Sequence, residues 1–98
     1  MSEFVLTQAA KGDLLKILEY LEGDNPNAVL KVVNALDAAM QLLANNPGVG
    51  HLRPDLTPQE VRFWSVFRYL VIYRPDTKPL EIIRVLHGKR DVRRLLEE

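Results

Sequence analysis

The chain has 98 residues, of which thirteen are basic and thirteen acidic, so its formal charge is zero and its isoelectric point is near 6.7. Hydrophobic residues make up 47% of the sequence and charged residues 27%, which predicts one globular domain over residues 1–98 and excludes a disordered chain. The absence of cysteine excludes disulfides, thiolate metal sites and a cysteine nucleophile, and makes the cytoplasm the expected compartment.

Nucleic acids and membranes are not expected as direct partners. Overall neutrality argues against bulk electrostatic attraction to nucleic acid, so we expect no direct DNA binding. The start, Met1-Ser2-Glu3, lacks the basic region of a signal peptide. The longest apolar stretch, residues 28–44, does not resemble a membrane span, because polar side chains interrupt it at Lys31, Asn34, Asp37 and Gln41.

The charges are unevenly distributed along the chain. Residues 1–50 hold three basic and six acidic groups, whereas residues 51–98 hold ten basic and seven acidic groups, so the halves carry −3 and +3. An arginine-rich half suggests an acidic partner. The alternative is that these arginines are solvated on the surface and bind no partner. Eight of its basic groups are arginines, at Arg53, Arg62, Arg68, Arg74, Arg84, Arg90, Arg93 and Arg94.

The first half predicts a short strand and two helices. Residues 3–6 indicate a strand, and Thr7 is a suitable N-cap for a helix over residues 8–22. After a break at residues 23–25, Asn25 is positioned to cap a second helix over residues 26–45, with Pro26 in its first turn. The connection is short, so the two helices should form an antiparallel hairpin.

The second half predicts strands. Residues 61–65, 68–74 and 80–87 are rich in β-branched and aromatic side chains, and their short connections favour an antiparallel meander. A short final helix should follow, with Asp91 at its N-cap. The predicted fold is therefore α+β, in the order β-α-α-β-β-β-α, with the helical hairpin packed on a small, mainly antiparallel sheet.

Two of the predicted strands are apolar on both faces. On residues 80–86, alternation places Ile82 and Leu86 on one face and Ile83 and Val85 on the other. The helical hairpin can cover one face of the sheet, but the final helix is small. We therefore expect exposed apolar surface that marks a partner site, unless that helix and the stems of the arginines cover it.

Most catalytic patterns are absent. There is no glycine-rich phosphate loop after a strand, and His51 and His87, without clustered carboxylates, predict neither a metal site nor a cofactor. Around His87 lies a basic group that could orient a phosphodiester. The alternative is a structural turn in which His87 bonds the backbone and Asp91 caps the helix. The residues concerned are Arg84, His87, Gly88, Lys89, Arg90 and Asp91.

The segment from Arg84 to Asp91 resembles the C-terminal signature of ParE toxins, in the RelE/ParE superfamily of type II toxin–antitoxin modules. The resemblance extends over nearly the whole chain and includes the family's element order. Further similar segments are Leu6-Thr7, Ala9-Ala10, Asp13-Leu14, Ile17, Tyr20, Asn46-Pro47-Gly48, Arg53-Pro54-Asp55-Leu56, Val61-Arg62 and residues 67–74.

This resemblance implies a cytoplasmic toxin, of a kind associated with plasmid stabilisation, that a ParD-like ribbon-helix-helix antitoxin neutralises in a complex. A disordered antitoxin tail would fold on the toxin, and acidic residues in it would complement the positive half. By analogy with characterised ParE toxins, the expected target is DNA gyrase, inhibited by binding and without catalysis.

Two alternatives stay open. RelE-type relatives cleave mRNA on the ribosome, in which case Arg68, His87 and Arg84 would be the catalytic residues. Gly88 departs from that pattern, because RNA-cleaving relatives have an aromatic residue after the histidine. A degenerate member would bind its antitoxin and lack toxicity.

The residues expected to bind the target or the antitoxin come mostly from the second half. Structural roles are expected for His87 and Asp91, and Trp64 is either an interface anchor or a core side chain. The full set is Arg53, Arg62, Trp64, Arg68, Tyr73, Arg84, His87, Arg90 and Asp91.

Overall fold

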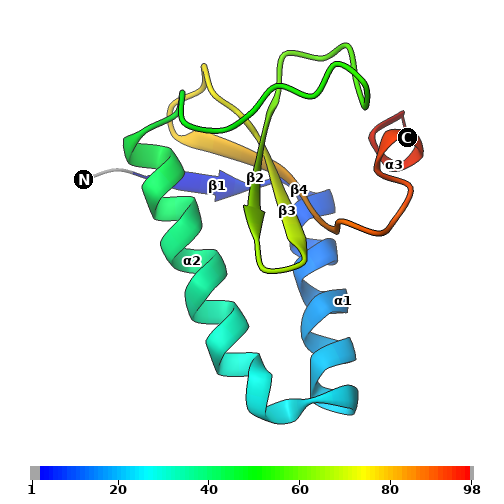
Figure 1. Ribbon diagram of the computed structural model, residues 1–98. Helices are drawn as coiled ribbons and strands as arrows, with labels where there is room; N and C mark the ends of the chain where they lie inside the picture. The colour runs from blue at the N-terminus through cyan, green and yellow to red at the C-terminus, as the bar shows by residue number, and fades with distance from the viewer. Residues whose placement is uncertain (1–2, 98) are drawn as a thin grey trace.

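The computed structural model describes residues 3–97 (Figure 1). Met1 and Ser2, part of the start inspected for a signal peptide, lie outside the described residues, as does Glu98. The order of elements is β-α-α-β-β-β-α, as predicted, with one added 3-10 turn. The elements are β1 (Phe4–Leu6), α1 (Gln8–Asp24), η1 (Pro26–Ala28), α2 (Val29–Asn45), β2 (Arg62–Val66), β3 (Tyr69–Arg74), β4 (Leu80–His87) and α3 (Val92–Glu97).

The four strands form one sheet in the order β1-β4-β3-β2. β2, β3 and β4 pair antiparallel, which confirms the predicted meander, and β1 joins the edge parallel to β4. The predicted boundaries of β2 and β3 are shifted by one residue. Phe67 and Arg68 form the turn between these strands, so Arg68 is not part of β3.

The two long helices differ from prediction at the connection between them. Thr7 caps α1 as expected, because its hydroxyl accepts a hydrogen bond from the amide of Ala10 at 3.1 Å. α1 continues two residues beyond the predicted end, to Asp24. The prediction that Asn25 caps the second helix is wrong, since its side chain makes no capping bond there. A single 3-10 turn reverses the chain first, and α2 begins at Val29.

α1 and α2 run antiparallel and pack against the same face of the sheet (Figure 1). The core on this face, here called the hairpin-side core, joins buried side chains of both helices with alternate residues of the strands. Its members are Ala10, Leu21, Val32, Leu36, Ala39, Met40, Leu43, Val66, Tyr69, Val71, Tyr73, Leu80, Ile82 and Val85.

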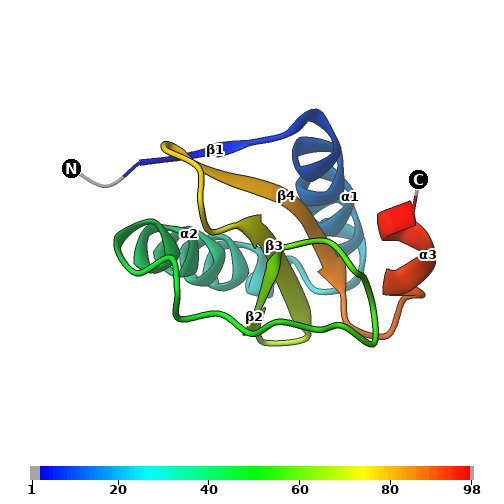
Figure 2. The same ribbon diagram turned by 90° about the horizontal axis from the view of Figure 1, so that it is seen from above.

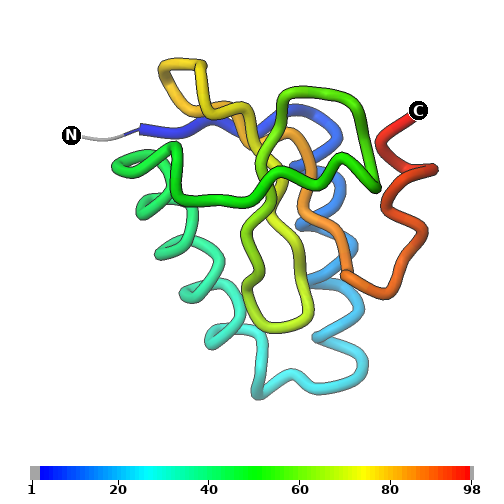
Figure 3. The backbone as a smooth tube through the Cα atoms, turned by 45° about the horizontal axis from the view of Figure 1, so that its top comes forward, coloured from blue at the N-terminus to red at the C-terminus, as the bar shows by residue number. Residues whose placement is uncertain are grey.

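The opposite face of the sheet is covered, contrary to the expectation of an exposed apolar surface. α3 lies on the other side of the strands from α2 (Figure 2). The segment between α2 and β2 passes across the sheet and approaches α3 before it enters β2 (Figure 3). Together they bury a second cluster, here called the α3-side core: Val61, Phe63, Ile72, Leu86 and Val92. The loop supplies Leu56 and Val61, and this contribution could not be read from the strand pattern.

The predicted faces of β4 are also wrong, because the ladder between β3 and β4 is irregular. Ile72 pairs with Arg84, and Tyr73 pairs with Ile82, so Ile83 is an extra residue on β4. An extra residue reverses the alternation of faces beyond it. Ile82 and Val85 therefore share the hairpin side, whereas Ile83 and Leu86 pack on the α3 side.

Within residues 3–97, none of the helices combines the length and the hydropathy needed to cross a membrane.

Candidate functional site

The predicted binding residues differ widely in exposure. Their environments divide them into side chains that a partner can reach and side chains that serve the fold. Arg53, Arg68, Arg90 and Asp91 are exposed, Arg62, Trp64, Arg84 and His87 are half-buried, and Tyr73 is fully buried.

Arg84 is held inside the molecule by an ion pair with Asp13. Its Nε and Nη2 donate to the two carboxylate oxygens of Asp13, at 2.8 and 2.9 Å, and its Nη1 donates to the carbonyl of Leu95 at 3.1 Å. The same carboxylate accepts the backbone amide of Val85 at 3.0 Å. Arg84 thus joins α1, β4 and α3, and its guanidinium is committed to the fold.

Tyr73 fixes the loop that follows α2. Its hydroxyl donates to the carbonyl of Pro47 at 2.7 Å and accepts the amide of Gly50 at 2.9 Å. A Cβ at Gly50 would lie 2.5 Å from that hydroxyl oxygen, so the close approach requires glycine. Arg62 holds the same loop through a bond to the Gly50 carbonyl at 2.8 Å. Burial raises the pKa of the Tyr73 phenol, and the Gly50 bond lowers it by less.

His87 and Asp91 form the structural turn described as an alternative above. His87 Nδ1 accepts the amide of Lys89 at 3.1 Å, and its ring meets Tyr69 edge-on with centroids 5.7 Å apart. The amide of Gly88 donates to the carbonyl of Arg68 at 2.8 Å, which ties this turn to the turn between β2 and β3. Asp91 caps α3, as predicted, by accepting the amide of Arg94 at 3.3 Å.

Arg53 and Trp64 lie away from this turn. Arg53 forms a bidentate pair with Asp55 on the exposed loop, and this hydrogen bond lowers the pKa of Asp55. Trp64 is half-buried against the hairpin-side core, and its ring stacks on His51 with centroids 6.3 Å apart. The structure therefore does not bring these two residues together with Arg68 and His87.

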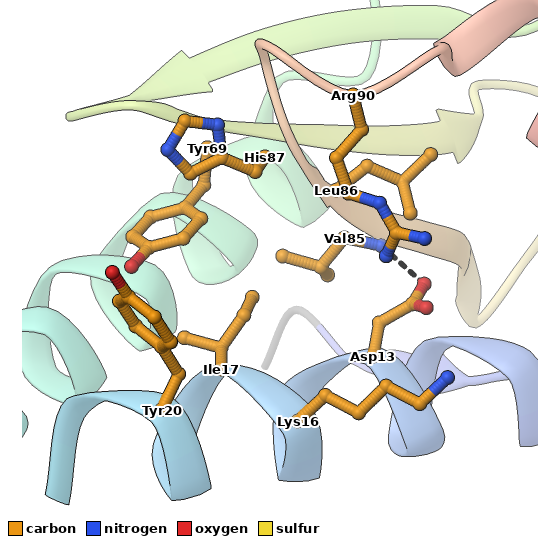
Figure 4. Close-up of a pocket in the computed structure, with 9 residues that line it drawn as sticks. All are labelled: Asp13, Lys16, Ile17, Tyr20, Tyr69, Val85, Leu86, His87 and Arg90. Atoms are coloured by element: carbon orange, nitrogen blue, oxygen red, sulfur yellow. Dashed lines mark hydrogen bonds between the residues drawn. The ribbon is translucent and has the colours of Figure 1, made fainter. Parts of the chain in front are cut away.

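A groove surrounds the pair of Tyr69 and His87. It consists of three adjoining pockets of about 290, 410 and 380 Å³, and all three include these two residues in their walls. The first pocket lies against α1, where Tyr20 and Tyr69 turn their hydroxyl groups toward the same point (Figure 4). The second runs toward the start of α2, and the third lies beside the turn at Phe67 and Arg68.

Several residues of this groove are not among the binding residues predicted from the sequence. Lys16, Ile17 and Tyr20 lie with Asp13 along one side of α1, at the i, i+3, i+4 and i+7 positions of a single helical face. That spacing is visible in the sequence, but the sequence alone does not show that this face of α1 lines a groove.

Phe67 was also missed, and it has an unusual backbone. It is 58% exposed at the turn between β2 and β3, and its φ of 54° lies in the left-handed region that bulky residues rarely adopt. The Nζ atom of Lys31 lies 5.4 Å from the centre of its ring. Nothing in the local sequence signals this conformation.

The groove is suited to binding, because its walls provide apolar surface and positive charge. Its walls combine aromatic and aliphatic side chains with the cations Lys16, Lys31, Arg68, Lys89 and Arg90. Within residues 3–97, no cluster of three His, Asp or Glu side chains has the arrangement to hold a metal ion.

Comparisons with known proteins agree with this fold. A solved structure described as the chromosomal ParDE TA system from P. aeruginosa matches with a TM-score of 0.71 at 24% identity, and the match covers 91% of this chain and 98% of the other. At that identity the likeness establishes the fold. A search among curated proteins finds no match. The family model for the ParE toxin of the type II toxin–antitoxin system parDE matches residues 4–92, so the chain belongs to the ParE toxin family.

Proposed function

We propose that this protein is a growth-inhibiting toxin that acts in the cytoplasm by binding DNA gyrase, without catalysis, and that a ParD-like ribbon-helix-helix antitoxin neutralises it in a hetero-oligomeric complex. The observation that carries the proposal is the ParE family match over residues 4–92. The target and the identity of the antitoxin are carried over from the family by analogy.

The exposed arginines are the contacts we assign to the target or the antitoxin. Arg68 and Arg90 stand at the groove, and Arg53 stands on the loop before β2. Arg84 and Tyr73 support these surfaces from inside, since their polar groups are already bonded within the chain.

Two observations favour binding over RNA cleavage. Cleavage of a phosphodiester by a neighbouring hydroxyl needs a base and an acid, usually with a cation for the developing charge. Arg84, one of the three residues considered for that chemistry, is engaged by Asp13 and Leu95. One ring nitrogen of His87 accepts the amide of Lys89, and no carboxylate within residues 3–97 lines the pocket beside Arg68 and Gly88.

The endoribonuclease remains the second candidate because one observation favours it. Arg68 and His87 come from neighbouring turns and line the same two pockets, so an arginine and a histidine do face a common space. A cleaving enzyme of this design would depend on both side chains.

Pulse-labelling after induced expression in a bacterium separates the two functions. We expect DNA synthesis to fail first, with an SOS response, and the purified protein to inhibit supercoiling by gyrase. Earlier collapse of protein synthesis, with mRNA cleavage that Arg68→Ala or His87→Gln abolishes in folded protein, would instead establish the endoribonuclease. Unchanged growth together with tight antitoxin binding would identify a degenerate member.

A further inference from the structure

We propose that this protein forms a symmetric dimer in which the α1 helices of two copies pack against each other in antiparallel orientation. The contact surface, here called the α1 stripe, consists of Lys11, Leu15, Leu18 and Glu22. The inference goes beyond the proposed function, since it concerns contacts between two copies of this chain and does not depend on the target or the antitoxin.

The four residues of the α1 stripe lie on one side of the helix. They follow one another at intervals of four, three and four positions, which is the seam spacing of helices that pair as coiled coils. At 3.6 residues per turn they fall within an arc of about 60°. Lys11, Leu15 and Glu22 are exposed, with 61% of Leu15 open to solvent, and Leu18 is half-buried. A second helix can therefore reach all four side chains.

The order of these residues makes the α1 stripe complementary to itself. A cation, two leucines and an anion follow one another along the helix, so an antiparallel copy sets Lys11 opposite Glu22 at both ends and leucine opposite leucine in the middle. A parallel copy would instead set like charges opposite each other. Within residues 3–97, neither Lys11 nor Glu22 forms an ion pair. A two-fold axis between the leucines thus gives every residue of the stripe a suitable partner, as an isologous interface requires.

An apolar cavity beside the α1 stripe adds hydrophobic surface to this contact. It has a volume of about 200 Å³ and lies between β1, α1 and α2, with Leu18 and Val33 in its walls. Among the described residues that line it, Asp37 is the only acidic one, and it accepts a hydrogen bond from Gln41 at 2.8 Å. The antiparallel arrangement places Leu15 of one copy against Leu18 of the other, at the wall of the cavity. Association would bury Leu15 and cover Val33, which is 37% exposed, and the removal of this apolar surface from water favours the dimer.

The dimer leaves the groove around Tyr69 and His87 open in both copies. Asp13, Lys16 and Tyr20 line that groove from α1 (Figure 4). At 3.6 residues per turn, the centre of this group lies about 160° around the helix axis from the centre of the α1 stripe. A molecule bound in the groove and a second copy bound at the stripe therefore use different sides of α1. One dimer would present two grooves, which a partner with two binding segments can engage together.

Sedimentation velocity of the full-length protein without antitoxin tests the proposal. A contact of one helix per copy is small, so we expect a dimer that dissociates in the range of about 10–100 µM, within a measured series from about 1 µM to 1 mM. Leu15→Asn removes an apolar side chain from both halves of the interface. It should weaken dimerisation about 30-fold or more, because the two-fold axis makes every substitution count twice.

Charge reversal gives a sharper test because it predicts a rescue. Lys11→Glu sets two like-charged pairs into the dimer and should weaken it about 3- to 10-fold, with a larger effect at low salt, and Glu22→Lys should act in the same way. The double variant Lys11→Glu/Glu22→Lys restores both pairs in the opposite sense. It should dimerise within about threefold of the wild type, and a rescue of this kind requires that the two residues face each other.

Matched controls repeat these chemical changes away from the α1 stripe. Leu42 is 42% exposed on α2, and Lys78 is exposed in the turn before β4; neither lines the apolar cavity. Leu42→Asn and Lys78→Glu should alter dimerisation less than about twofold, as expected for surface substitutions outside the interface. Thermal denaturation checks that every variant is folded.

The outcomes separate this inference from the proposed function. A wild type that stays monomeric over the whole concentration series would overturn the inference, and so would a dimer that Leu15→Asn and Lys11→Glu leave unchanged, since its interface would lie elsewhere. If the wild type is monomeric and Leu15→Asn weakens binding of the antitoxin, the stripe belongs to the antitoxin interface instead. None of these results changes the toxin activity, which pulse-labelling measures separately.

Discussion

The strands β3 and β4 support two polar regions of opposite character. In the closed region, Asp13, Arg84 and Tyr73 are buried or half-buried. Asp13 and Arg84 bond to each other across 71 positions of the chain, and the hydroxyl of Tyr73 bonds to Pro47 and Gly50 in the loop after α2. In the open region, Phe67 and Arg68 are exposed beside the groove, and the cation of Arg68 has no carboxylate partner among the described residues. The same sheet thus uses one set of polar side chains within the fold and leaves another set exposed beside the groove.

The contrast between Arg84 and Arg68 shows why residue type is a poor guide to role. Both arginines were predicted to bind a partner or to act in catalysis. Arg84 pairs with Asp13, 71 positions earlier in the chain, whereas Arg68 is exposed, lines the groove and forms no ion pair within residues 3–97. The difference lies in tertiary placement, and substitutions can test it.

The largest effect is expected from Asp13→Asn in the closed region. The change removes the carboxylate charge that Asp13 places beside the Arg84 guanidinium, where the arginine side chain is only 19% exposed, and it weakens the bond to the amide of Val85. Breaking one partner of a buried ion pair typically costs about 3–5 kcal/mol of unfolding free energy. Equilibrium denaturation in urea measures this loss.

The matched control for that substitution is Glu81→Gln. Glu81 near the start of β4 pairs with Arg74 at the end of β3, with 3.0 Å between the Arg74 Nε and a carboxylate oxygen of Glu81, but both side chains are more than a third exposed. An exposed pair contributes about 0–1 kcal/mol, so the control should lose much less stability than Asp13→Asn. Equal losses in the two variants would remove the distinction between the closed pair and an ordinary surface pair.

A smaller effect is expected from Tyr73→Phe, which keeps the ring and deletes the hydroxyl. The amide of Gly50 and the carbonyl of Pro47 both lose their partner in the closed region. Leaving a buried donor unsatisfied costs about 1–3 kcal/mol. Hydrogen exchange at Gly50 should accelerate together with the loss of stability, and unchanged exchange would show that the loop does not depend on the hydroxyl.

The raised pKa of Tyr73 should make the stability of the fold depend on pH in the alkaline range. Burial raises the pKa of its phenol above the unfolded value of about 10, so the folded state holds the proton more tightly than the unfolded state. The resulting stabilisation is fully present below pH 10 and is lost as the pH rises toward the folded pKa. Denaturation curves between pH 8 and about 11.5 should show a steeper fall for the wild type than for Tyr73→Phe.

The fold could be predicted from sequence because its signals are local. Thr7 stands directly before its helix, Asp91 stands directly before α3, and β-branched runs mark the strands. The faces of β4 could not be predicted, because one irregularity at Ile83 reverses the alternation of side chains between the two faces of the sheet. The coverage of the α3-side core likewise depends on Leu56, in a loop without periodicity.

The candidate site was predicted only in part, for a related reason. The turn around His87 follows from neighbouring residues, so its hydrogen bonds were foreseeable. The groove wall that includes Tyr20 requires α1 to be placed against the ends of β3 and β4, and this is a tertiary fact. The uneven charge of the two halves indicated a basic surface in the second half. Three of the cations in the groove walls are nevertheless lysines, and two of these, Lys16 and Lys31, come from the acidic first half; the third is Lys89.

The smallest expected effect concerns the backbone of Phe67 in the open region. Its φ of 54° disfavours any side chain with a Cβ, whereas glycine adopts this conformation without strain. Phe67→Gly and Phe67→Ala both remove the ring and its contact with Lys31. The difference between their free energies of unfolding therefore isolates the effect of the backbone conformation. We expect the glycine variant to be more stable than the alanine variant by about 1 kcal/mol.

The neighbouring Arg68 provides the control, because its φ is not positive. There the order should reverse, with Arg68→Ala at least as stable as Arg68→Gly, since glycine gains entropy in the unfolded chain without relieving strain. Thermal denaturation of the four variants measures both differences. If Phe67→Ala matched Phe67→Gly, the turn would be relaxed. If instead the predicted order holds, the protein tolerates a strained, exposed aromatic at the groove, and functional sites are where such strain is typically retained.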